Sequence, residues 1–329
     1  MTFQDKAAKY CEKGWLSPRV RDNLIGFYES YKEVVERKGD SMSNHEQLFD
    51  VYLELVREQV LHPYPFQPYH KQLRAPFDYY LFGIEFLRPL LDKNQCKTYG
   101  LEIFDQIEIN LKKGHNVIFY ANHQVEADPQ AVSLLLEKTH NSIGENVIFV
   151  AGERVLTDLV AIPFSLGRNL LCIYSKRHID NDPELKEQKL MHNKKTMSVM
   201  CELLAEGGKA IYVAPSGGRD RPIADGTVPP AEFDPSSIEM FYLMAKKSGT
   251  KTHFYPLALN TYDLLPPPQT VEKELGEKRT IKGGGISLAV GDEINMEQFP
   301  GSQEKDKHVR RKLRADYIHS LVKEYYETL

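Results

Sequence analysis

Residues 116–139, NVIFYANHQVEADPQAVSLLLEKT, decide the fold of this 329-residue chain. Residues 116–120 are a short run of β-branched and aromatic side chains, which is typical of a buried strand. A polar cluster follows, and residues 129–139 then carry the apolar spacing of a helix. A strand that leads through a polar loop into a helix is the unit from which layered α/β folds are built.

The same alternation extends through the rest of the chain. Further strands are predicted at 146–150, 170–174, 209–213, 252–259 and 286–290, and further helices near 183–205, 235–247 and 304–326. We therefore predict an α/β fold whose sheet is mixed, largely parallel and flanked by helices. Ligands of such sheets bind beyond the carboxyl ends of the strands. Three of the predicted strands end in polar clusters, at 121–123, 175–178 and 214–219, so we expect a site at this edge.

Residues 1–72 show a different pattern. The segments 19–37 and 44–61 place their apolar side chains on one stripe, with the 3.6-residue period of amphipathic helices. Prolines at 63, 65 and 68 then prevent a helix from continuing. We predict a smaller N-terminal helical-bundle domain, residues 1–72, followed by a larger α/β domain, residues 73–329, that carries the site.

Composition and charge exclude several classes of protein. A chain with 41% hydrophobic and 27% charged residues can build a core, which rules out global disorder. The net charge of −4 argues against a nucleic-acid binder, because such domains are usually strongly basic. Four scattered cysteines show no disulfide or metal-ligand spacing, which favours a reducing compartment. We recognise no secretory signal, transit peptide or membrane span, and expect a cytoplasmic or plastid-stromal protein.

The polar cluster of the opening stretch contains His123 and Asp128, spaced as HxxxxD. The spacing alone is weak evidence. His45 and Asp50 show it too, but inside the predicted helix 44–61, where they lie about 140° apart around the axis and cannot face each other. The loop around His123 can instead fold the carboxylate back onto the imidazole. A carboxylate on one ring nitrogen fixes the tautomer and leaves the other nitrogen as a base.

Other residues of this loop have simpler interpretations. Asp128 and Pro129 also suit the N-cap and first turn of the helix that follows, a role compatible with orienting His123. Asn122 and Glu126 are expected to be structural or to face solvent.

Two further clusters at strand ends are cationic. Their basic members are Lys176, Arg177, His178, Arg219 and Arg221. The guanidinium fork suits phosphate or carboxylate, and Gly217 and Gly218 let the backbone approach an anion. Either cluster alone could be a solvated loop, but both are predicted at the same sheet edge as His123. We interpret them as an anion site in which Asp220 partly neutralises or orients the arginines.

Together these motifs resemble one known family. They are NHxxxxD at 122–128, VAGER at 150–154, PFSLGRN at 163–169, YSKRH at 174–178, APSGGRDRP at 214–222, YPLAL at 255–259 and the prolines 266–268. The combination is similar to the soluble glycerol-3-phosphate 1-O-acyltransferases, and most similar to their plastid and chlamydial branch. The resemblance covers most of residues 75–290, and its combined motifs are far more specific than HxxxxD.

The resemblance implies transfer of a fatty acyl group to the sn-1 hydroxyl of glycerol 3-phosphate, the first step of phospholipid synthesis. The implied donor is acyl-acyl-carrier protein or acyl-CoA, any membrane contact is at most peripheral, and no metal or cofactor is implied. His123 would be the general base, oriented by Asp128. Positions 177, 178, 219 and 221 would bind the phosphate, with Lys176 beside them. Position 177 is Arg where plant members carry Lys, so a planar fork replaces a compact ammonium.

The residues suit this chemistry on their own account. A phosphate dianion requires a cationic pocket, and an alcohol that attacks a thioester requires a base of near-neutral pKa. His is the usual base and contributes roughly 10²–10⁴-fold. Two alternatives stay open: acylation of lysophosphatidate, and non-catalytic binding of a phosphorylated ligand or an acidic carrier protein. The basic residues of 305–314 offer a surface for such a carrier.

Overall fold

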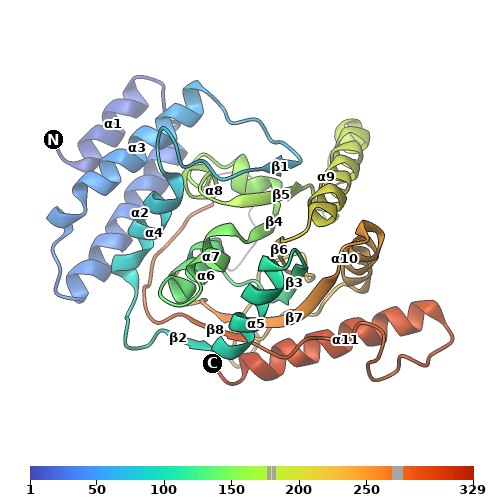
Figure 1. Ribbon diagram of the computed structural model, residues 1–329. Coiled ribbons are helices and arrows are strands. Elements are labelled where there is room, and N and C mark those ends of the chain that lie inside the picture. Colours follow the sequence, from blue (N-terminus) through green and yellow to red (C-terminus); the bar gives the residue numbers. More distant parts are fainter. Residues whose placement is uncertain (176–178, 180–182, 269–276) are drawn as a thin grey trace.

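The strands form one mixed sheet in the computed structural model, which describes residues 1–175, 179, 183–268 and 277–329 (Figure 1). The strands are β1 (Tyr69–His70), β2 (Lys97–Tyr99), β3 (Asn116–Ala121), β4 (Ile148–Gly152), β5 (Asn169–Ile173), β6 (Ala210–Val213), β7 (Thr252–Asn260) and β8 (Ser287–Val290). The helices are α1 (Phe3–Glu12), α2 (Pro18–Arg37), α3 (Glu46–Leu61), α4 (Tyr79–Leu87), α5 (Leu101–Lys112), α6 (Asp128–Leu136), α7 (Asn141–Asn146), α8 (Ile162–Ser165), α9 (Lys186–Glu206), α10 (Pro235–Ser248) and α11 (Lys307–Tyr326).

The strand order is β1-β5-β4-β6-β3-β7-β8-β2. The inner strands β5, β4, β6, β3 and β7 are parallel, whereas β8 runs antiparallel to β7 and β1 antiparallel to β5. The predicted fold class, a mixed and largely parallel sheet, is confirmed. Because the inner strands are parallel, their carboxyl ends meet at one edge, where β3 lies between β6 and β7.

Apolar cores cover both faces of the sheet. One face packs against α5, α6 and α7 through residues such as Phe104, Val132 and Ile143. The other face packs against α9, α10 and α11 through residues such as Phe241 and Ile318. Figure 1 shows the sheet enclosed between these helices. Strands buried on both faces read as continuous apolar runs, which explains the sequence of residues 116–121.

The N-terminal helices α1, α2 and α3 gather beside the sheet and share a third core (Figure 1). Tyr52 of α3 is fully buried in it and packs on Phe86 of α4 and Phe164 of α8. This core therefore joins the N-terminal helices to elements that lie beyond residue 73. Strand β1 also enters the sheet just before that residue. The division into domains at residue 72 stays a prediction.

Local signals explain where several helices begin. Ser17 caps α2 by accepting the N–H of Val20, and Pro18 occupies the first turn. Asp234 caps α10 in the same way, again with a proline following. None of the helices in the described residues is both long and apolar enough to cross a membrane.

Candidate active site

Strand β3 delivers His123 to the carboxyl edge of the sheet. All six residues of β3 are buried between β6 and β7. The chain leaves the sheet at Ala121, and the helix α6 begins at Asp128. The intervening six residues form a loop that turns back over the strand end, so the loop geometry predicted for this segment is present.

The imidazole of His123 and the carboxylate of Asp128 are in contact. Nδ1 of His123 lies 2.7 Å from Oδ2 of Asp128. The His123 side chain is 32% exposed, whereas that of Asp128 is only 2% exposed. Because the carboxylate engages Nδ1, the opposite nitrogen Nε2 is the one available to a substrate. The arrangement can hold a neutral imidazole in one tautomer and stabilise the imidazolium that forms on proton uptake.

Asp128 is itself fixed by several donors. Its Oδ2 accepts the N–H of Gln124 at 2.8 Å, and its Oδ1 accepts the N–H of Val125 at 3.3 Å and the hydroxyl of Thr261 at 2.5 Å. The prediction that Asp128 caps α6 is wrong in position, since Ala127 is the N-cap and Asp128 is the first helical residue. Its carboxylate binds the preceding loop because the chain folds back toward His123.

Asn122 and Gln124 tie the same loop to strand β7. Asn122 donates to Leu259 O and Asp220 Oδ2 and accepts the N–H of Leu259, all within 2.9 Å. Gln124 accepts the N–H groups of Thr261 and Tyr262. Of the two roles predicted for Asn122, structural or solvent-facing, the structure shows the structural one. Gln124 and Thr261 were not predicted, because a contact between segments so distant in sequence leaves no local pattern.

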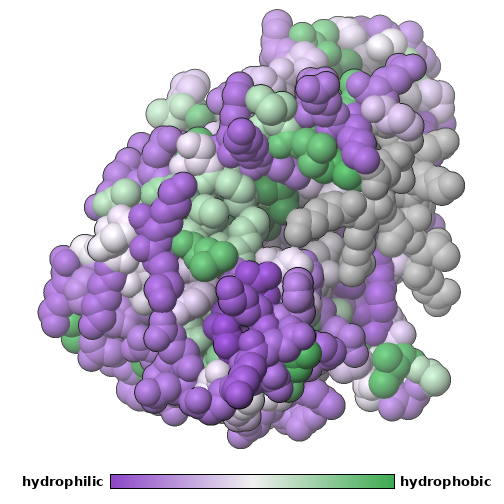
Figure 2. Space-filling view, turned by 90° about the vertical axis from the view of Figure 1, so that its right-hand side faces the viewer, coloured by the Kyte–Doolittle hydropathy of each residue, from purple (hydrophilic) through white to green (hydrophobic). Residues whose placement is uncertain are grey.

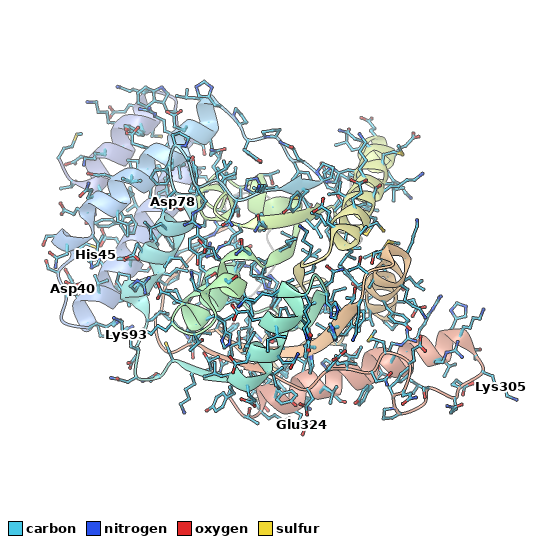
Figure 3. The ribbon with its side chains drawn as sticks, in the orientation of Figure 1. Asp40, His45, Asp78, Lys93, Lys305 and Glu324 are labelled. Atoms are coloured by element: carbon cyan, nitrogen blue, oxygen red, sulfur yellow. The ribbon has the colours of Figure 1, made fainter. Side chains whose placement is uncertain are left out.

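The second HxxxxD sequence behaves as expected for a chance match. His45 lies at the N-terminus of α3, and its Nε2 contacts Asp40 rather than Asp50, at 2.8 Å. Figure 3 shows Asp40 and His45 together at the outer side of the N-terminal helices. Asp50 is paired with Lys6 instead. The HxxxxD spacing therefore gives no contact between His45 and Asp50.

The two predicted anion-binding arginines follow β6. Nη2 of Arg219 lies 2.7 and 2.9 Å from the two carboxylate oxygens of Glu277, and Nη1 of Arg221 donates to Pro268 O at 2.8 Å. Burial and the neighbouring Arg219 together lower the pKa of Arg221. Glu277 offsets part of this lowering, and an anion bound beside Arg221 would favour its charged form further. The other predicted cations, Lys176, Arg177 and His178, lie outside the described residues.

Asp220 does not orient these arginines through its side chain, contrary to the prediction. It is fully buried, and its carboxylate accepts Asn122 Nδ2 at 2.8 Å and the N–H of Ala231 at 2.9 Å. Its own N–H donates to the carbonyl of His123 at 2.6 Å. The aspartate turns inward because Asn122 offers a buried donor there. Its backbone thereby fixes the Arg219–Arg221 segment to the His123 loop.

Glu126 is structural, one of the two roles predicted for it. Its carboxylate pairs with the guanidinium of Arg279, with Nε at 2.6 Å and Nη2 at 3.0 Å. Burial alone would raise the pKa of Glu126, but Arg279 outweighs it, so the pKa lies below its ordinary value. Neither Arg279 nor Glu277 was predicted. Among the described residues, no group of three or more His, Cys, Asp or Glu side chains is placed to hold a metal ion.

The basic segment 305–314 lies far from this site. Helix α11 runs from Lys307 to Tyr326, and the hydroxyl of Tyr326 contacts Gln124 Nε2 at 3.0 Å. Nineteen residues at 1.5 Å each separate its two ends by about 28 Å. Figure 3 shows Lys305 at the far extremity of the molecule. Arg311 and Arg314 are also paired with Glu239, which argues against this segment as the surface that receives an acyl donor.

Comparison with known sequences gives consistent results. The Acyltransferase family profile matches residues 102–260, which include the whole His123–Asp128 loop. The chain is 41% identical over 320 residues to a chloroplastic glycerol-3-phosphate acyltransferase of Cucurbita moschata, covering 96% of this chain and 69% of that protein. It is 40% identical over 328 residues to the chloroplastic glycerol-3-phosphate acyltransferase of Arabidopsis thaliana, covering 98% and 70%.

Comparison with solved structures gives a weaker likeness. The 1-acyl-sn-glycerophosphate acyltransferase of Thermotoga maritima aligns with a TM-score of 0.42 and 19% identity, over 76% of this chain and 78% of that one. These values are too low to decide between related activities.

Proposed function

This chain belongs to the glycerol-3-phosphate acyltransferases, and from that premise we propose that His123 is the general base of the acyl transfer and Asp128 orients it. The observation that carries the proposal is the 2.7 Å contact between His123 Nδ1 and the buried Asp128 carboxylate, which directs Nε2 outward. A base in this position can take the proton of an alcohol as the alcohol attacks.

The reaction follows from these groups. Nε2 of His123 takes the proton of the sn-1 hydroxyl of glycerol 3-phosphate while the oxygen attacks the carbonyl carbon of an acyl thioester. The new C–O ester bond forms, the C–S bond breaks, and the departing thiolate receives the proton from the imidazolium. The products are 1-acyl-sn-glycerol 3-phosphate and a free thiol. The donor is acyl-acyl-carrier protein or acyl-CoA, and the step as written uses no metal or cofactor.

The substrate phosphate is proposed to bind Arg219 and Arg221. Both lie in the loop that follows β6, and the N–H of Asp220 between them is bonded to the carbonyl of His123. This backbone link supports a fixed spacing between a phosphate on the arginines and a hydroxyl at His123. Lys176, Arg177 and His178 stay predicted members of the same anion site.

Peripheral contact with a bilayer is part of the proposal, because the product is a lipid. Leu185, just before α9, and Leu190 and Met191 in its first turns are each between 47% and 52% exposed, with exposed lysines at 186, 194 and 195. Figure 2 views the molecule from the side on which α9 and α10 lie in Figure 1, and it shows hydrophobic residues gathered among hydrophilic ones on this side. The proposed location is the cytoplasm of a bacterium or the stroma of a plastid.

The catalytic assignment is tested with labelled glycerol 3-phosphate and both acyl donors. We expect His123→Ala to lose roughly 10²–10⁴-fold in kcat, with the affinity for glycerol 3-phosphate nearly unchanged. His45→Ala is the matched control, since it removes the histidine of the other HxxxxD sequence, and should retain full activity. Full activity in His123→Ala would refute the role of His123, and wild-type acylation of lysophosphatidate but not of glycerol 3-phosphate would refute the proposed acceptor.

The phosphate assignment is tested on KM. Arg219→Ala and Arg221→Ala should each raise the KM for glycerol 3-phosphate about tenfold or more, because a charge-assisted hydrogen bond to the phosphate contributes roughly 1.5–3 kcal/mol. The KM for the acyl donor should stay within about twofold. Equal increases in both KM values would indicate a general distortion of the pocket and contradict the assignment.

A further inference from the structure

Arg279 is a buried arginine behind the site, in the chain that leads to β8. Its side chain is 7% exposed, and four hydrogen bonds engage its guanidinium group. Nε and Nη2 bind the two oxygens of Glu126, at 2.6 and 3.0 Å, and Nη2 also binds Oδ2 of Asp158 at 3.1 Å. Nη1 donates to the carbonyl of Glu277 at 2.9 Å. Burial alone would lower the pKa of Arg279, but Glu126 and Asp158 outweigh burial and raise it.

These four bonds join segments that surround the site. Glu126 belongs to the loop between His123 and Asp128. Asp158 follows β4 and accepts the N–H of Val160 at 3.1 Å, and the carbonyl of Val160 in turn accepts the hydroxyl of Tyr52 from α3. The guanidinium therefore connects the His123 loop with the chain after β4 and, through it, with the N-terminal helices.

The fourth bond leads to the anion site. The carbonyl that Arg279 holds belongs to Glu277, whose carboxylate binds Nη2 of Arg219 through both oxygens. The side chains of Arg219 and Glu277 are 15% and 5% exposed, so little solvent competes with this pair. The guanidinium of Arg279 therefore binds Glu126, in the loop between His123 and Asp128, and also the carbonyl of Glu277, whose carboxylate binds Arg219.

We propose that Arg279 is a positioning residue that sets the place of Arg219 relative to the His123–Asp128 pair. The proposal rests on the phosphate role of Arg219 given above. Transfer requires the sn-1 hydroxyl to reach Nε2 of His123 while the phosphate lies on Arg219, so the spacing of the two groups must be fixed. A displacement of the order of 1 Å can cost about 10²-fold in rate. A planar fork with several simultaneous bonds holds such a spacing better than flexible loops do.

The test compares Arg279→Lys with Arg314→Lys. Lysine keeps the charge but is a point donor on a flexible stem, and it cannot reproduce the fork. Arg314 is the matched control because it is also buried, 8% exposed, and pairs with Glu239 of α10 on the face of the sheet away from Arg279. Both variants should lower the melting temperature. Steady-state kinetics with glycerol 3-phosphate and acyl-CoA are then measured on the folded fraction of each.

We expect Arg279→Lys to raise the KM for glycerol 3-phosphate about tenfold or more and to lower kcat by up to about 10²-fold, with the KM for acyl-CoA within about twofold. Arg314→Lys should leave all three values within about twofold. If the kinetic constants of the folded fraction are normal in Arg279→Lys, the proposal is overturned. The proposed phosphate role has a separate readout, because its failure appears as a normal KM in Arg219→Ala.

A second variant keeps the test decisive if Arg279→Lys does not fold. Glu126→Gln retains an acceptor for Arg279 but removes one charge of the network, and it should raise the KM for glycerol 3-phosphate alone. Where Arg279→Lys does fold, the double variant should show less than the sum of the two single effects, because both act through one contact. An unchanged KM in Glu126→Gln, or strict additivity of the two substitutions, counts against the positioning role.

Discussion

Asp220 is a buried carboxyl group whose protonation is linked to folding. Burial raises its pKa from the ordinary value of 3.8 to about 6, although Asn122 and the N–H of Ala231 partly stabilise the carboxylate. The folded state therefore binds this proton more tightly than the unfolded state does. The resulting stabilisation is fully present below about pH 4 and is lost as the pH rises through about 6, and it amounts to roughly 3 kcal/mol over this range.

Because the stabilisation by protonated Asp220 is lost as the pH rises, Asp220→Asn should change how the free energy of unfolding depends on pH. Relative to the asparagine variant, the wild type should lose roughly 3 kcal/mol of its free energy of unfolding between about pH 4 and pH 7. Urea denaturation of both proteins at several pH values measures the difference, and other titrating groups cancel in the comparison. Parallel pH profiles for the two proteins would show that Asp220 ionises normally in the folded state.

Single residues also show how far a motif can be read from sequence. The difference between His45 and His123 could be predicted, because one lies in a helical pattern and the other between a strand and a helix. The residues that hold the His123–Asp128 pair in place could not be predicted. Thr261 reaches Asp128 only because β7 lies beside β3, and Arg279 reaches Glu126 across 153 residues of sequence. No local spacing records such contacts.

At the scale of elements, the long periodic helices and the strands β3 to β8 were predictable, whereas β1, β2 and α4 were not. The predicted strands match β3 to β8 within two residues. Strands β1 and β2 are too short to show alternation. Helix α4 has the sequence YYLFGIEFL, whose nearly continuous apolar character carries no helical period. It is apolar on most sides because it lies between the N-terminal helices and α6 and α8.

Gly167 provides a test of how α4 packs. A Cβ atom at this position would lie 2.5 Å from the backbone carbon and oxygen of Tyr79, at the start of α4. Because backbone cannot move aside as a side chain can, Gly167→Ala should lower the free energy of unfolding by about 1–3 kcal/mol. Thermal or denaturant unfolding measures the change.

Gly152 is the matched control for this substitution. It lies at the end of β4 with φ −74°, and a Cβ atom there would meet nothing within 4 Å. Gly152→Ala should therefore stay within about 0.5 kcal/mol of the wild type. Equal stability of the two variants would mean that the close approach of residue 167 to α4 is relieved by a movement of that helix.

At the scale of the whole molecule, the parallel strands explain why distant motifs form one site. The His123 loop and the Arg219–Arg221 segment leave neighbouring strands at the same edge, which the strand pattern allowed us to predict. The position of α11 could not be predicted, since helix direction depends on packing against β7. Its basic end at 305–314 consequently lies about 28 Å from the end that touches Gln124.

The start of α9 gives the last prediction, which concerns membrane contact. Leu190 and Met191 are exposed beside lysines. A bilayer rich in anionic lipid would bury the two apolar side chains and attract the lysines. The double substitution Leu190→Gln and Met191→Gln should weaken binding to vesicles of phosphatidylglycerol and phosphatidylcholine roughly tenfold, because it removes more than about 1.4 kcal/mol of apolar transfer.

Ile109→Gln is the control, since Ile109 is 45% exposed on α5, which covers the opposite face of the sheet. Sedimentation with the vesicles measures binding, and raised salt should weaken the wild type because the lysines contribute. Equal losses in both variants, or wild-type binding that is the same on pure phosphatidylcholine, would exclude the start of α9 as the contact with an anionic bilayer.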